Sequence, residues 1–415
     1  MKKHCFPFLV STMLVAVIGI LSSCTTNNDG DRESGFETID EAGFKGDRES
    51  FDSSASDGGE GDENGNTSAG IITAGEWNDL DHWPFWSGLM LSEEFGDKSE
   101  YWHFFTNNRM AVEVTDESGN TIAGVSVKLL RQTDEGLKTV WEAITDNHGQ
   151  ANCWLGLYQQ ETANAELLQV SINGEIMDGH PSICAWDSIG QTMVNRYISK
   201  APAALKQQAD IAFVVDATGS MGDEIDFLKS DLTDIIGKAS SVRPGITMRT
   251  AALFYRDEGD EYLTRHSDFT ENLNETADFV KRQKAGGGGD YPEAVHTALE
   301  RTLQNLSWNE NARTRLVFLI LDAPAHYQDD VISSLQKSIC LYAQKGIRVI
   351  PVAASGVDKN TEFMLRFFAI ATGGTYVFLT DDSGVGFEHI KASVGEYKVE
   401  QLNDLLIRLI NYYTE

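Results

Sequence analysis

The sequence is poor in positive charge. Its 415 residues carry 33 Lys and Arg against 63 Asp and Glu, a formal net charge of −30. Nucleic acids and anionic lipid surfaces are bound mainly through Lys and Arg, so this balance argues against both as partners. An acidic partner is then expected only where a cation intervenes between the two negative charges.

Long apolar runs are scarce as well. The run from Phe8 to Leu21 follows Lys2 and Lys3, and it is too short for a membrane-spanning helix, which needs about 20 apolar residues. It fits a secretory signal peptide. The run ends in the residues Leu21-Ser22-Ser23-Cys24, which resemble the lipobox of bacterial lipoproteins.

The lipobox resemblance implies that residues 1–23 are removed and that Cys24 is acylated, so that lipid holds the chain at its N-terminus. Residue 25 is Thr rather than Asp. The resemblance therefore implies an outer-membrane lipoprotein, on the cell surface or alternatively on the periplasmic face. A plain signal peptide with a chance cysteine is the competing interpretation.

Cysteine is also rare, with five residues in the chain. If Cys5 is removed and Cys24 is acylated, Cys153, Cys184 and Cys340 remain, and an odd number cannot pair completely. One disulfide between Cys153 and Cys184 is an open alternative in an oxidising compartment. Cys340 lies in an apolar helical pattern and is expected to be a buried small hydrophobe.

The composition nevertheless predicts folded domains. Apolar residues make up 41% of the chain, which excludes wholesale disorder. After the signal peptide we predict three regions: the lipidated cysteine with a disordered acidic linker, an all-β sandwich, and an α/β domain. Their boundaries are residues 24–74, 75–205 and 206–415.

Residues 75–205 alternate apolar and polar positions between turns, as half-buried strands do. The segment from Val112 to Val127, followed by Thr145-Asp146-Asn147, resembles the carboxypeptidase-regulatory-like modules of surface proteins. Such a resemblance implies a structural, spacer-like role. Aromatic residues from Trp77 to Phe105 are expected to pack the entry segment onto the sandwich, with a carbohydrate-stacking surface as the alternative.

Residues 206–415 carry near-continuous apolar runs that alternate with amphipathic segments. Runs at 211–215, 315–321, 348–353 and 375–379 are typical of parallel strands covered by helices on both faces. Runs near 248–254 and 262–269 flank an acidic turn and predict an antiparallel edge hairpin. The fold class is therefore a doubly wound, mostly parallel α/β sheet, whose ligands bind at the carboxyl ends of the strands.

Three groups of polar residues fall at those strand ends. The first strand finishes in Asp216-Ala217-Thr218-Gly219-Ser220, and a central strand finishes at Asp322. A glycine loop, residues 286–289, leads into Asp290. Neighbouring carboxylates repel one another unless a cation separates them, and an all-oxygen set suits Mg²⁺ first, with Ca²⁺ or Mn²⁺ as alternatives.

Residues 210–415 resemble a von Willebrand factor A (VWA) domain, and Asp-x-Thr-x-Ser resembles the start of its metal-ion-dependent adhesion site. The resemblance implies metal ligation by Asp216, Thr218 and Ser220 in a first loop and by Asp322 in a third. The second loop usually carries Thr, whereas Asp290 stands here. A third acid would offset more of the cation's positive charge and so weaken its attraction for a partner's carboxylate. The alternatives are that Asp290 binds through water or lies outside the coordination shell.

The favoured function is a lipid-anchored module whose bound cation accepts an acidic side chain from a protein partner. A periplasmic scaffold for envelope proteins is the alternative. No GxSxG or HExxH motif and no evident Cys–His pair occurs. We therefore predict that the chain is not an enzyme, and a metal-assisted hydrolase is the weaker alternative. Arg256, Asp257 and Asp260 are expected in a solvated turn, with His326 on the rim of the site.

Overall fold

The computed structural model describes residues 72–185, 193–200, 205–380 and 391–415. The predicted signal peptide, Cys24 and nearly all of the acidic linker lie outside the described residues. The described residues all belong to one compact unit. No helix in the described ranges is both long enough and apolar enough to cross a membrane.

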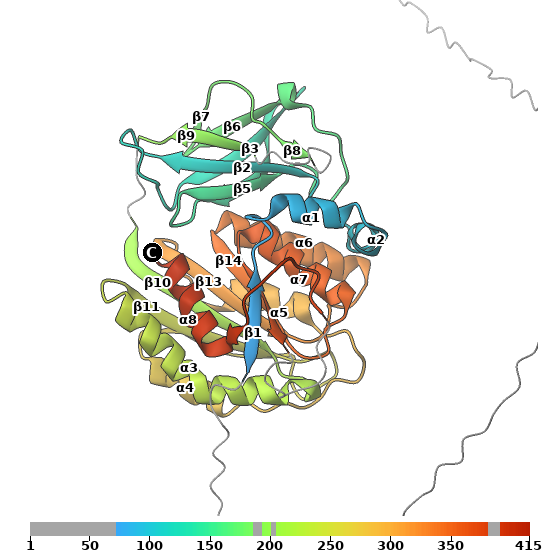
Figure 1. The fold of residues 1–415 in the computed structure, drawn as a ribbon, viewed down its shortest axis with the longest axis vertical. Coiled ribbons are helices and arrows are strands. Elements are labelled where there is room, and N and C mark those ends of the chain that lie inside the picture. Colours follow the sequence, from blue (N-terminus) through green and yellow to red (C-terminus); the bar gives the residue numbers. More distant parts are fainter. Residues whose placement is uncertain (1–71, 186–192, 201–204, 381–390) are drawn as a thin grey trace, which may run out of the picture. The chain divides into compact units, whose positions relative to one another are not determined.

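An eight-stranded sheet lies at the centre of the α/β part, in the order β12-β11-β10-β13-β14-β15-β1-β16 (Figure 1). The five strands from β11 to β15 in this order run parallel, and β11 pairs antiparallel with β12, which confirms the predicted edge hairpin. These strands are β10 (Lys206–Asp216), β11 (Thr247–Tyr255), β12 (Thr264–Thr270), β13 (Ala312–Leu321), β14 (Ile347–Ala353), β15 (Tyr376–Thr380), β1 (Thr73–Trp77) and β16 (Glu400–Gln401).

Helices cover both faces of this sheet. One hydrophobic cluster joins it to α3 (Gly222–Val242), α4 (Leu273–Lys281) and α8 (Leu402–Tyr413). The other cluster joins it to α5 (Val295–Asn305), α6 (Asp329–Gln344) and α7 (Lys359–Thr372). The predicted α/β architecture with helices on both faces is therefore present.

Strand β1 spans the predicted boundary between the linker and the β-sandwich. It pairs antiparallel with β15, with Thr73 opposite Thr380 and Trp77 opposite Tyr376. Ala74 on this strand is fully buried in the core. The pairing satisfies backbone groups of β15 that would otherwise be exposed at a sheet edge. The α/β part therefore begins before the predicted sandwich, not after it.

Two helices follow β1 where strands were expected, α1 (Trp83–Met90) and α2 (Glu93–Trp102). Trp86, Phe95 and Trp102 of these helices, with Phe104, are buried. The ring centroids of Phe104 and Phe367 on α7 lie 4.0 Å apart, and those of Trp86 and Phe363 on α7 lie 6.0 Å apart. The aromatic residues do pack internally. Their main partner is α7 of the α/β part rather than the sandwich, because α7 presents the phenylalanine rings of Phe363, Phe367 and Phe368 to them.

Two small sheets occupy residues 108–198. The first has the order β5-β2-β8 with β9 also paired to β2, and the second has the order β4-β3-β6-β7. Their strands are β2 (Asn108–Thr115), β3 (Ser126–Thr133), β4 (Gly136–Ile144), β5 (Gln150–Trp154), β6 (Leu168–Ile172), β7 (Glu175–Ile176), β8 (Cys184–Ala185) and β9 (Val194–Ile198).

The strand order rules out the Cys153–Cys184 disulfide that the sequence left open. Cys153 on β5 lies opposite Met110, and Cys184 on β8 lies opposite Arg109, so β2 stands between the two cysteines. Two inter-strand spacings separate their backbones by about 10 Å, whereas a disulfide needs Cα atoms closer than about 7 Å. No disulfide joins them in this structure.

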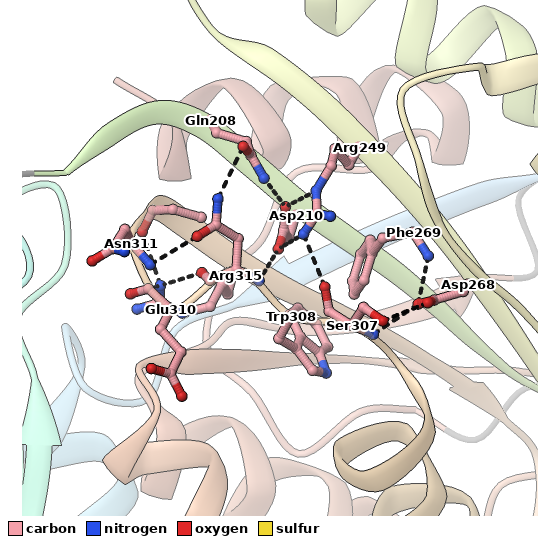
Figure 2. A network of polar contacts seen from close by, with 12 residues as sticks. Gln208, Asp210, Arg249, Asp268, Phe269, Ser307, Trp308, Glu310, Asn311 and Arg315 are labelled. Carbon is pink, nitrogen blue, oxygen red and sulfur yellow. Dashed lines mark hydrogen bonds and ion pairs between the residues drawn. The ribbon is translucent and has the colours of Figure 1, made fainter.

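A polar network closes the amino-terminal end of the large sheet (Figure 2). Asp210, at the start of the buried part of β10, is fully buried and forms a two-pronged ion pair with Arg249, at 2.6 and 2.9 Å. It also accepts hydrogen bonds from the Gln208 side chain and from the Asn309 backbone N–H, both at 2.7 Å. Both oxygens of this buried carboxylate are therefore satisfied.

Candidate functional site

The opposite end of β10 carries the first predicted site residues. Asp216 is the last residue of the strand and has no exposed surface. Its Oδ1 accepts hydrogen bonds from the Thr218 backbone N–H at 2.9 Å and from the Thr218 hydroxyl at 2.7 Å. Since that hydroxyl donates its proton to Asp216, lone pairs of its oxygen stay available to another ligand. Asp216 Oδ2 makes no hydrogen bond.

Asp322 directly follows β13, the neighbour of β10 in the sheet, and it is 7% exposed. Its Oδ1 also makes no hydrogen bond. Ser220 lies in the turn that begins α3, and hydrogen bonding from its side chain opposes the rise in the pKa of Asp322 that burial causes. The structure therefore brings Asp216, Thr218, Ser220 and Asp322 together, as the sequence predicts for the first and third loops.

The glycine loop packs directly on the first loop. The Gly219 N–H donates to the Gly287 carbonyl at 3.2 Å, and the Gly286 N–H donates to the Ala217 carbonyl at 3.0 Å. Gly288 has a φ of +73°, and a Cβ there would lie 3.0 Å from Glu293 Oε1 and 3.2 Å from Thr218 Cβ. Glycine is needed here for both its backbone conformation and its lack of a side chain.

Glu293 is the acid that the glycine loop delivers to the site, and the sequence analysis did not assign it. It is 3% exposed, its Oε2 makes no hydrogen bond, and its backbone N–H donates to the Pro324 carbonyl at 2.9 Å in the loop after β13. Glu293 lies two residues before α5 and follows Asp290 by three residues, so the sequence offered both acids as candidates for the site. The two differ in burial, which the sequence does not show.

Asp290 is exposed on the same loop. Among the described residues, no three His, Cys, Asp or Glu side chains are grouped so as to hold a metal ion. The predicted set of three carboxylates, Asp216, Asp290 and Asp322, is therefore not assembled in this structure. The physical reason is that three charged groups without a counter-ion repel, and the exposed loop lets Asp290 remain in water.

The electrostatics of the three buried acids are unusual. Burial raises the pKa of Asp216 to about 7, and the charge of Asp322 adds to that rise, while the hydrogen bonds from Thr218 oppose it. Burial raises the pKa of Glu293 to about 9, with Asp216 as the first of several acids that add to the effect. Burial also raises the pKa of Asp322. All three carboxyl groups thus lack a compensating positive charge.

This arrangement fits a hard cation. Asp216 and Asp322 each have one buried carboxylate oxygen that makes no hydrogen bond, and the hydroxyl groups of Thr218 and Ser220 bond to these two carboxyl groups. Buried unpaired carboxylates are costly, and a divalent ion with oxygen ligands would remove that cost. Asp216, Thr218, Ser220 and Asp322 are the residues that could hold it, with Glu293 beside them.

The hairpin turn after β11 differs from the expectation of a solvated loop. Arg256 and Asp257 are buried. Arg256 donates from Nε to the Ala217 carbonyl at 3.0 Å and from Nη2 to the Lys284 carbonyl at 2.9 Å, so it ties the first loop to the glycine loop. Asp257 lies 2.7 Å from His326 Nε2, and Asp260 accepts the Gly288 N–H at 2.9 Å. The turn supports the site because its side chains make the hydrogen bonds to the neighbouring backbone groups that water would otherwise make.

Sequence comparison defines the class of domain that carries this site. Residues 210–381 match the model of the von Willebrand factor A domain. Such domains generally take part in protein–protein interaction. A VWA domain is thus found over residues 210–381 of the predicted α/β domain.

Two relatives share part of the chain. The alpha-protein kinase vwkA of Dictyostelium discoideum is 33% identical over 202 residues, which are 48% of this chain and 32% of that protein. An ariadne-like RING finger protein of Acanthamoeba polyphaga mimivirus is 30% identical over 130 residues, 31% of this chain and 12% of that protein. The chain therefore spans about a third or less of the length of these relatives.

The comparison with vwkA overturns one prediction. The absence of hydrolase motifs led to the expectation that the chain is not an enzyme. A relative that is 33% identical over about half of the chain is named an alpha-protein kinase, which is an enzyme, so the prediction that the chain is not an enzyme is withdrawn. Each short catalytic motif is typical of one class of enzyme, so the absence of GxSxG and HExxH argues only against those classes and not against every enzymatic activity.

Proposed function

We propose that the VWA domain binds a divalent cation through Asp216, Thr218, Ser220 and Asp322 and uses it to bind a protein partner. The observation that carries this proposal is the pair of buried carboxylate oxygens, Asp216 Oδ2 and Asp322 Oδ1, that have no hydrogen-bond donor. Mg²⁺ suits the short hydroxyl and carboxylate ligands best, with Ca²⁺ and Mn²⁺ as alternatives. A cation bound there supplies positive charge to an acidic side chain of the partner.

The anchoring is a separate part of the proposal. Acylation of Cys24 would hold the chain at the outer membrane, with the VWA domain presented on the cell surface. The alternative is a periplasmic scaffold that binds envelope proteins through the same site. Protease treatment of intact cells distinguishes them, because a surface domain is cleaved and a periplasmic domain is protected. A Cys24→Ser variant that still fractionates with the membrane would contradict the lipid anchor.

The cation is tested by thermal-shift titration of the full chain with Mg²⁺, Ca²⁺ and Mn²⁺ in turn. We expect the melting temperature to rise with at least one of these ions, and to stay constant for Asp216→Ala and for Asp322→Ala. Asp226→Ala is the matched control, because Asp226 is an exposed aspartate on α3 that should leave the response intact. A wild-type chain that is indifferent to all three ions would refute the proposal.

Enzymatic activity is a second proposal, and it rests on the relative named an alpha-protein kinase. The reaction to test first is phosphoryl transfer from ATP to a mixed protein substrate, with Mg²⁺ or Mn²⁺ present. Activity that survives in Asp216→Ala would place the chemistry away from the cation site. Absence of transfer by the wild-type chain under conditions where a control kinase is active would remove this proposal.

A further inference from the structure

The loops that surround the cation site are strongly acidic. Together the five loops carry 14 Asp and Glu residues but only three Lys and Arg residues. They comprise residues 216–224, 256–261, 284–293, 322–330 and 356–362. A divalent cation offsets only a small part of this excess. A partner that brought nothing but a carboxylate would meet net repulsion as it approached.

Two of the three positive charges in these loops are already engaged, and the third, Lys284, is an exposed side chain before the glycines. Arg256 donates to backbone carbonyls within the site and lies near Glu261. Lys359 forms a 2.8 Å ion pair with the buried Glu362 and also donates to the Ser393 hydroxyl. Arg256 and Lys359 are therefore poorly placed to offer charge to a partner, which leaves Lys284 alone against the 14 acidic residues of these loops.

Three exposed tyrosines stand at the same edge of the sheet. Tyr101 from α2 stacks on Tyr327 from the loop after β13, with ring centroids 3.8 Å apart. They are 39% and 46% exposed, and Tyr291 on the glycine loop is 44% exposed. The Asp358 backbone N–H donates to the Tyr291 hydroxyl at 3.1 Å, and the Asp358 charge also acts on Tyr101. We call Tyr101, Tyr291, Tyr327 and Asp358 the tyrosine rim.

The tyrosine rim is fixed rather than loosely attached. Trp102 donates from its indole nitrogen to Asn360 Oδ1 at 3.0 Å, which holds the end of α2 against the start of α7. Asp358 caps α7 by accepting the Thr361 backbone N–H at 2.7 Å. The Tyr291 hydroxyl also lies 3.2 Å from the Thr361 hydroxyl, which ties the glycine loop to the start of α7. Rigid, half-exposed tyrosines are typical of binding surfaces because little side-chain entropy is lost on contact.

We propose that the partner presents a basic segment to this surface, in which one Glu or Asp reaches the cation and flanking Arg or Lys side chains contact the tyrosine rim. The proposal rests on the function proposed above. Aromatic faces attract guanidinium and ammonium groups, and the neighbouring acids add to the attraction. Charge complementarity thus selects a basic protein segment over an acidic or uncharged one.

The test is a selection of displayed peptides against the full chain. One library has a central Glu with randomised flanks, the other a central Gln with the same flanks, and both are selected in Mg²⁺ and in EDTA. We expect Lys and Arg to be enriched in the flanks of the Glu library in Mg²⁺. A selected basic peptide should bind Tyr101→Ala/Tyr327→Ala at least about fivefold more weakly. Tyr412→Ala, which removes a comparably exposed tyrosine at the other end of the sheet, should bind like the wild type.

Asp358→Asn guards against a folding defect, because the amide can still cap α7 while its charge is lost. It should weaken the same basic peptide and flatten the dependence of its affinity on salt. If both Asp358→Asn and the double tyrosine variant bind as the wild type does, the tyrosine rim is not the binding surface and the inference is overturned.

The remaining outcomes separate this inference from the function on which it rests. Enrichment of acidic or uncharged flanks around Glu, dependent on Mg²⁺, would overturn the basic segment and leave the cation-centred function standing. Basic flanks selected equally around Gln and in EDTA would support binding of a basic segment to the tyrosine rim and count against the cation-centred function. No enrichment in either library would overturn the inference.

Discussion

Asp210 and Asp216 lie on the same buried strand, β10, and neither has any exposed surface. At the amino end of the strand, Asp210 is held by the Arg249 guanidinium and two further donors, so both of its oxygens are satisfied (Figure 2). At the carboxyl end, Asp216 Oδ2 makes no hydrogen bond, and burial raises the pKa of Asp216 to about 7 although hydrogen bonding from Thr218 and Tyr255 opposes the rise.

The difference between Asp210 and Asp216 distinguishes a buried carboxylate that stabilises the fold from one that serves a functional site. A buried carboxylate that contributes to folding needs a paired cation and hydrogen bonds, as Asp210 has. A buried carboxylate left without them lowers stability, and such groups gather at functional sites. We infer that the cost at Asp216 is retained because a cation removes it. The following predictions set the two ends of the sheet against each other.

The largest expected effect is at the amino end. Arg249→Met leaves the Asp210 carboxylate buried without its cation, which should lower the free energy of unfolding by about 3–5 kcal/mol. Urea denaturation of the two chains measures the difference. Lys238→Met is the control, since it breaks an exposed ion pair with Asp234 and should change stability little. A loss at Arg249 no larger than that at Lys238 would contradict the structural role.

The next effect is a dependence on pH at the carboxyl end, measured in EDTA. Because folding raises the pKa of Asp216 to about 7, the folded state holds a proton that the unfolded state releases near pH 4. The Asp216 proton should therefore make the wild type lose stability as the pH rises from about 4 to about 7, with a contribution from this one group of up to about 1.4 kcal/mol per pH unit.

Asp216→Asn isolates this effect from the other acids. The variant cannot titrate at position 216, so the difference in unfolding free energy between the two proteins should change across that pH range. A difference that stays constant with pH would show that Asp216 is not the group responsible. Raised pKa values at Glu293 and Asp322 should leave a weaker dependence of the same sign in the variant.

The smallest effect concerns the glycine loop. Gly288→Ala places a methyl group 3.0 Å from Glu293 Oε1 on a backbone with positive φ, which should cost about 1–2 kcal/mol and weaken cation binding. Gly289→Ala is the matched control, because no heavy atom lies within 4 Å of a Cβ there. Equal stability and equal cation response in the two variants would remove the argument for a close-packed loop.

Much of the fold and part of the site followed from local patterns. Near-continuous apolar runs predicted the parallel strands, and strand ends are visible in sequence, so Asp216, Thr218 and Asp322 could be placed on one edge. The β1–β15 pairing was missed because it joins segments about 300 residues apart, as Thr73 and Thr380 are. No local pattern reports such a pairing.

Burial within loops was the other failure. Asp290 and Glu293 belong to the same acidic motif, yet Asp290 is exposed and Glu293 is buried. The positive φ of Gly287 and Gly288 sets the direction of that loop, and sequence shows only that glycines are present. Arg256 and Asp257 were likewise predicted to be solvated, and this prediction was wrong. Their partners, Ala217 and His326, lie at the ends of other strands, so the local sequence does not show these contacts.

The most direct test of the central claim compares Asp210→Asn with Asp216→Asn at mildly alkaline pH, in EDTA and in saturating Mg²⁺. The measured quantity is the free energy of unfolding. We predict that the wild type gains about 2.7 kcal/mol at a free Mg²⁺ concentration of about 100 times the dissociation constant. Asp210→Asn should be less stable than the wild type in both buffers and should keep that gain. Asp216→Asn should be at least as stable as the wild type in EDTA and gain nothing from Mg²⁺. An Asp216→Asn chain that Mg²⁺ stabilises as much as the wild type would contradict the account.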